Sequence, residues 1–176
     1  MSRRAIILLL GFLLPQASQA APPKELYGKS VIVTWAEARE QRTEGELAWR
    51  WVHGSQALNI YVSEAGRVFN NLVYATDGGS ANRGDQIAGH GGNRAITFNG
   101  PSMLMMSPHG KGGANRISVA FDSSYASCTA EVLKAKESEA TIVKSYSQII
   151  NHMVEIKSIK VSGSACNVRS GNVFGK

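Results

Sequence analysis

Two aspartates and two histidines in or beside a glycine-rich stretch are the candidates for acid–base chemistry or metal binding. Asp77, Asp85, His90 and His109 are spread from residue 77 to residue 109. Imidazole and carboxylate groups bind zinc and transfer protons near neutral pH. Their spacing matches neither an HExxH motif nor two histidines one helical turn apart. We therefore expect solvated loop residues, with no metal and no cofactor. A small secreted hydrolase or metal-dependent enzyme that uses these loops is the alternative.

Three tryptophans, Trp35, Trp49 and Trp51, are the most substantial candidates for ligand binding. Indole rings on one face of a sheet stack against sugar rings or line an apolar pocket. The core of a small domain produces the same sequence pattern, because large apolar side chains are mostly buried. We expect these tryptophans to belong to the core, with a ligand-binding surface as the alternative.

Cys128 and Cys166 are the only two cysteines of the chain. Neither belongs to a CxxC motif, and no histidine nearby in the sequence would activate a thiol. In an exported protein, two such cysteines typically form a structural disulfide. The sequence therefore predicts a Cys128–Cys166 bond.

The N-terminal residues 1–20 have the pattern of a secretory signal peptide. Arg3 and Arg4 precede an apolar run from Ala5 to Leu14, and small residues lead to Ala20. This run is too short to cross a bilayer, which needs about 20 helical residues. The pattern predicts a single exported domain at residues 21–176, located in a periplasm or outside the cell. We expect no transmembrane segment in this mature part.

The charge balance argues against nucleic acid as a partner. The chain has a formal net charge of +6, and removal of Arg3 and Arg4 with the leader would leave +4. The remaining basic residues are scattered singly, with no run that would follow a phosphate backbone. An unknown envelope component or a small ligand is therefore the expected partner.

Alternating apolar and polar residues predict strands along most of the chain. Residues 31–35 alternate clearly, and residues 58–62 and 67–74 predict a hairpin around Ser63–Gly66. Residues 36–46 are polar and predict either an extended continuation or a solvated loop. Residues 130–140 suit either a strand or a short helix. In residues 153–162 the apolar phase slips near Lys157–Ser158, which predicts a β-bulge.

This pattern favours an all-β fold. We expect eight to ten short strands in one antiparallel sandwich or barrel, held by the single disulfide. No long helix is expected.

Three regions occur together in this chain: Gly28–Trp35, Ser127–Val132, and a C-terminal part running from Met153–Ile156 through Ser164–Cys166 to Ser170–Gly175. In this combination the chain resembles an uncharacterised family of small secreted alphaproteobacterial proteins of unknown function. The resemblance implies a bacterial envelope or secreted location. It implies no activity, cofactor or catalytic residue. The sequence as a whole favours an exported, non-enzymatic binding or envelope-associated protein.

Overall fold

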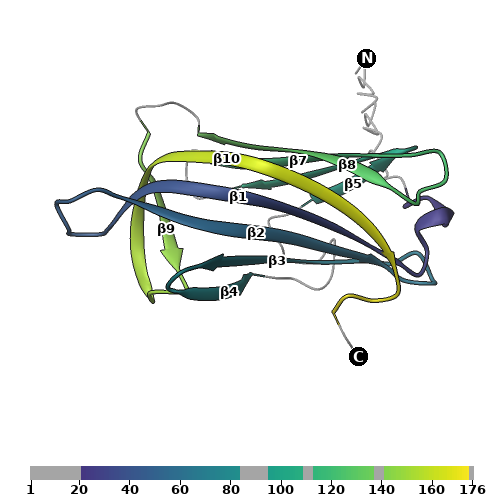
Figure 1. Cartoon of the computed structure of the whole chain (residues 1–176), viewed down its shortest axis with the longest axis horizontal. Helices are drawn as coiled ribbons and strands as arrows, with labels where there is room; N and C mark the ends of the chain where they lie inside the picture. The colour runs from purple at the N-terminus through teal and green to yellow at the C-terminus, as the bar shows by residue number, and fades with distance from the viewer. Residues whose placement is uncertain (1–20, 84–94, 109–112, 137–140, 175–176) are drawn as a thin grey trace, which may run out of the picture.

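The computed structural model describes residues 21–83, 95–108, 113–136 and 141–174. This part consists of ten strands and one short 3₁₀ helix, η1 (Lys24–Leu26). Six strands form one antiparallel sheet (Figure 1). In spatial order they are β4 (Gly79–Arg83), β3 (Val68–Thr76), β2 (Arg50–Val62), β1 (Lys29–Thr43), β10 (His152–Ser170) and β9 (Val143–Ser147).

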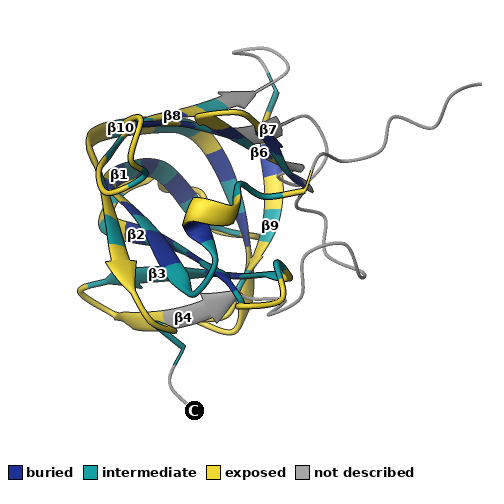
Figure 2. Cartoon of the chain, turned by 90° about the vertical axis from the view of Figure 1, so that its right-hand side faces the viewer, coloured by how far each residue is buried: buried dark blue, intermediate teal, exposed yellow. Residues whose placement is uncertain are grey.

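The other four strands form a second antiparallel sheet. In spatial order they are β5 (Ala95–Asn99), β6 (Ser102–Pro108), β7 (Gly113–Phe121) and β8 (Cys128–Lys136). Viewed along the strands, the six-stranded sheet curls into a half-barrel, and β8 lies beside β10 (Figure 2). The predicted antiparallel all-β fold is therefore confirmed, as a half-barrel covered by a second sheet.

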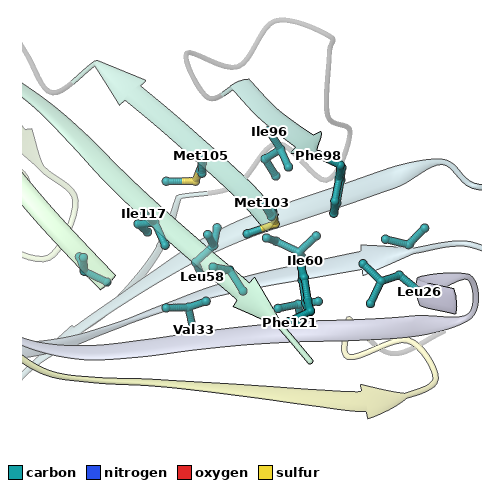
Figure 3. Close-up of a cluster of buried hydrophobic side chains, with 14 of the residues drawn as sticks. Leu26, Val33, Leu58, Ile60, Ile96, Phe98, Met103, Met105, Ile117 and Phe121 are labelled. Carbon is teal, nitrogen blue, oxygen red and sulfur yellow. The ribbon is translucent and has the colours of Figure 1, made fainter. Parts of the chain in front are cut away.

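The hydrophobic core lies between the two sheets (Figure 3). Because successive side chains of a strand point to opposite faces, every second residue enters this core. The six-stranded sheet contributes Val31, Val33, Trp35, Leu58, Ile60 and Val62. The four-stranded sheet contributes Ile96, Phe98, Met103, Met105, Ile117, Val119, Phe121 and Val132. Leu26 of η1 closes the core at the end where β1 begins.

The disulfide joins the two sheets. Cys128 is the first residue of β8 and Cys166 lies on β10, with their Cα atoms 5.4 Å apart. Ser164 Oγ also donates a hydrogen bond of 2.9 Å to the carbonyl of Ala130 across the same junction. The predicted Cys128–Cys166 bond is confirmed, and it fastens the edge of the second sheet to the half-barrel.

The structure also shows the local conformation of three segments for which the sequence made a prediction. The polar residues after position 35 continue β1 to Thr43, so the extended alternative holds. Residues 128–136 form strand β8, and residues 137–140 lie outside the described part. The expected hairpin is present, with Gly66 at φ 74° in the turn between β2 and β3.

The predicted bulge on β10 is present at Lys157. Ser158 pairs with Glu40 and Ile156 pairs with Gln41, so Lys157 is the extra residue. The expectation of short strands is wrong for β1 and β10, which have 15 and 19 residues. Bulges increase local twist, and this allows long strands to follow the curl of the sheet.

Candidate functional site

The inward-facing side chains of β1 change from apolar to charged along the strand. At one end they are Val31, Val33 and Trp35, and at the other end they are Glu37, Arg39 and Gln41. All six are buried, and the three polar residues are only 2%, 6% and 8% exposed. One continuous strand face therefore runs from the hydrophobic core into a polar interior.

Glu37 is the centre of this polar interior. Its carboxylate forms ion pairs with Arg39 on the same strand and with Lys134 on β8. It accepts a hydrogen bond of 2.6 Å from Gln56 Nε2 and one of 3.4 Å from Trp35 Nε1. We call these five residues the Glu37 network. It lies where the hydrophobic core ends.

The pKa of Glu37 lies below its ordinary value although the side chain is buried. Burial by itself raises the pKa of a carboxyl group, because it penalises the charged form. The positive charges of Lys134 and Arg39, together with their hydrogen bonds, lower the pKa by more than burial raises it. Glu37 is therefore ionised at neutral pH and is shared between two cations.

Arg39 is held from two sides. Its Nε donates a hydrogen bond to Glu37, and its Cζ lies 4.3 Å from the centroid of the Tyr74 ring. Tyr74 packs closely over Gly54 on the neighbouring strand β2. A Cβ atom at Gly54 would lie 2.9 Å from Cε2 of Tyr74 and 2.4 Å from the carbonyl oxygen of Ala75. Glycine at this position allows the ring to approach and orient the guanidinium.

Beyond the Glu37 network, a cavity of about 310 Å³ lies inside the curl of the six-stranded sheet. All its described lining residues come from this sheet and its turns. Its polar lining includes Arg39, Gln41, Arg50, Ser145 and Ser147. Its apolar and aromatic lining consists of Trp51, Val52, Tyr74, Ile149, Ile150 and Val154. This is the size and mixed character of a site for one small molecule.

Polar groups on this wall are left without protein partners. Gln41 is only 8% exposed, yet its side-chain amide makes no hydrogen bond within the described residues. The hydroxyls of Ser145 and Ser147 also make none there. In the described part of the chain, no side-chain atom of Gln41, Ser145 or Ser147 is fully buried without a hydrogen-bond partner, so these polar atoms are open to the cavity or to solvent. The wall is therefore suited to the polar groups of a ligand or to water.

Two turns meet beside the cavity. The Cγ2 atom of Ile149, in the β9–β10 turn, lies 3.8 Å from where a Cβ atom would stand at Gly78 in the β3–β4 turn. Both residues line the cavity, as does the exposed Asp77 next to Gly78. The opposite edges of the six-stranded sheet thus approach each other here.

The three tryptophans do not share one environment. Trp35 is 2% exposed and belongs to the core, as expected. Trp51 is 42% exposed, and the Lys160 Nζ lies 4.7 Å from the centroid of its ring. The core expectation is wrong for Trp51, because the more buried residues of this strand have even numbers and Trp51 lies on the opposite face, although residue 51 is also among those that line the cavity. Backbone alternation therefore outweighs hydrophobicity at this position.

Trp49 immediately precedes β2 and is half-buried outside the core cluster. Arg42 Cζ and Lys157 Nζ lie 4.5 Å and 5.8 Å from the centroid of its ring. The core expectation therefore fails for Trp49 too, since the cations that pack on its ring belong to the outer face. Ligand binding by the tryptophans stays a prediction.

Of the four metal candidates, only Asp77 lies in the described part of the chain. Asp85, His90 and His109 fall at residues 84–94 and 109–112, outside the described residues. Within the described residues, no group of three or more histidine, cysteine, aspartate or glutamate side chains is arranged to hold a metal ion. The metal hypothesis therefore stays a prediction.

Residue type and hydrophobicity in the sequence did not indicate the polar residues that build this site. Glu37, Arg39 and Gln41 follow the same odd-number alternation as the core residues before them. The alternation could have indicated their burial, because a strand that continues without a shift in register keeps pointing every second side chain to the same side of the sheet. No comparable signal points to Lys134, which joins the network from another sheet.

Within the described ranges, no helix has the length and apolar character needed to span a membrane. Comparison with known proteins finds no matching family model, no similar curated protein and no similar solved structure.

Proposed function

We propose that this chain is an exported, non-enzymatic binding protein that holds one small molecule in the cavity of its half-barrel. The observation that carries this proposal is the cavity of about 310 Å³, with polar and apolar walls supplied by the six-stranded sheet. Small-molecule sites are concave, largely apolar and provided with a few placed polar groups.

The buried polar residues of the cavity wall support a binding site rather than a packing defect. Arg39 and Gln41 would be costly to bury for stability alone, because polar groups lose hydration in the interior. The Tyr74 ring and the Glu37 carboxylate orient Arg39 in advance. A site whose groups are already oriented loses less entropy when it binds a ligand.

The disulfide supports the proposed exported location. The Cys128–Cys166 bond is of the kind that persists in oxidising compartments such as a periplasm or the extracellular space. The predicted signal peptide and the resemblance to small secreted proteins point the same way. Such a protein would carry or sense a small molecule of the cell envelope.

Titration with a neutral, apolar fluorescent probe, N-phenyl-1-naphthylamine, tests the cavity directly. We expect saturable binding with one site per chain and a rise in the melting temperature, because binding to the folded state stabilises it. Ser145→Trp places an indole in the cavity and should abolish probe binding. Ser55→Trp adds the same side chain at an exposed position outside the cavity and should leave binding intact.

Two results would contradict this proposal. One is the absence of saturable probe binding to the disulfide-bonded protein. The other is equal binding by the two tryptophan variants, which would place the bound probe outside the cavity.

A further inference from the structure

The polar wall of the cavity favours one chemical class of ligand. This inference rests on the proposed binding function. Two cations, Arg39 and Arg50, line the cavity, and the one carboxylate among its described lining residues is Asp77. Asp77 and Arg50 are both exposed, and Arg50 forms an ion pair of 3.8 Å with Glu46, whereas Arg39 is 6% exposed on β1. The inner part of the cavity is therefore electropositive.

Arg39 and Gln41 occupy successive inward positions of β1 and form the inner polar wall. An arginine fork donates two parallel hydrogen bonds to a carboxylate, and bonds of this charge-assisted kind are about twice as strong as neutral ones. The Gln41 amide brings two further donor hydrogens, and no described protein group accepts them. Glu37 neutralises Arg39 only in part, because its carboxylate also contacts Lys134.

The remaining lining is apolar. Val52 and Val154 lie on the strands that flank β1, and Ile149 and Ile150 lie in the turn between β9 and β10. A chain extending away from the inner polar wall would contact these side chains. At about 310 Å³ the cavity is near the lower limit for small-molecule sites, so it suits a short ligand.

We propose that the ligand is a small monocarboxylic acid with an apolar tail, whose carboxylate binds Arg39 and Gln41. Its tail packs against the valines and isoleucines of the cavity. Ligands of this class include medium-chain fatty acids and aryl-substituted carboxylic acids.

Competition against N-phenyl-1-naphthylamine with two matched compounds, octanoate and octanamide, tests this assignment at neutral pH. The two differ in the charge of the head group and share the same tail. We expect octanoate to displace the probe at a concentration about tenfold lower than octanamide, because its hydrogen bonds are charge-assisted. Equal displacement, or stronger displacement by octanamide, would overturn the assignment.

Gln41→Leu is the informative variant, because it removes the unpartnered amide without breaking an ion pair. We expect it to weaken octanoate binding relative to octanamide in the same competition, and to preserve the melting temperature of the free protein. Arg39→Gln should remove the preference for octanoate over octanamide. If Arg39→Gln does not fold, Gln41→Leu still decides, since unchanged octanoate affinity in that variant contradicts the proposed contact.

The two proposals fail in different ways. If the probe and both compounds do not bind, the binding function itself is wrong. If the probe binds in the cavity and octanoate shows no advantage, only the ligand class is wrong.

Discussion

The same two strands, β1 and β2, line two chemically different ends of the molecule's interior. At the end near η1, β1 and β2 face the four-stranded sheet and bury a continuous apolar cluster. At the other end, the same two strands present Arg39, Gln41, Arg50 and Val52 to a cavity. Burial by a second sheet stabilises the first end. Ion pairs, hydrogen bonds and a small apolar cluster of Val143, Val154 and Ile156 organise the second. A curled sheet can thus combine a stable core with a polar site when one inward face changes character along its length.

The Glu37 network is the boundary between these ends, and breaking it should have the largest effect. Glu37→Gln removes the carboxylate between Arg39 and Lys134. We expect the free energy of unfolding to fall by about 3–5 kcal/mol, because a buried cation that loses its counter-ion is costly. Urea denaturation followed by circular dichroism measures this change.

Glu25→Gln is the matched control for this prediction, since Glu25 is exposed in η1. It should change the free energy of unfolding by less than about 0.5 kcal/mol. If the two variants are equally stable, the network does not organise the polar end.

The apolar end should be nearly as sensitive to a cavity-forming change. Leu58 is fully buried in the core, and Leu58→Ala should lower the free energy of unfolding by about 2–5 kcal/mol. Leu47, in the β1–β2 loop, is 91% exposed, and Leu47→Ala should leave stability within about 0.5 kcal/mol. The same urea denaturation measures both, and similar losses would show that the core position of Leu58 is wrong.

At acidic pH, the wild-type protein and Glu37→Gln should have the same free energy of unfolding. The folded-state pKa of Glu37 is below its ordinary value, so ionised Glu37 stabilises the fold above the ordinary carboxyl pKa. This contribution is lost as the pH falls through the lowered folded-state pKa. Urea midpoints measured from neutral to acidic pH should converge for the two proteins, and a gap that widens in acid would contradict this assignment.

The smallest effect is expected on the outer face of the half-barrel. Trp51→Ala should cost less than about 1 kcal/mol, because Trp51 is 42% exposed, whereas burial and cavity terms dominate large losses. Trp35→Ala in the core should cost about 3–5 kcal/mol. In single-tryptophan variants, acrylamide should quench Trp51 fluorescence strongly and Trp35 fluorescence weakly. Equal quenching of Trp51 and Trp35 would contradict the assignment of Trp51 to the outer face and of Trp35 to the core.

Local patterns in the sequence determined much of the fold. Alternation predicted the hairpin at Ser63–Gly66, the phase slip predicted the bulge at Lys157, and two cysteines predicted their own bond. Each of these depends on neighbouring residues or on a pairing with one possible partner. The all-β class followed from the same short-range signals.

Only the tertiary structure decided what the polar end of the interior contains. Apart from Ala36 and Ala38, residues 36–46 are polar or glycine, so hydrophobicity did not reveal which face was inside. Burial of Glu37 depends on Lys134 from the other sheet and on Gln56 from β2, and Tyr74 reaches Arg39 only because Gly54 leaves room. These contacts join residues far apart in the chain, and their energies exist only once the sheet has curled.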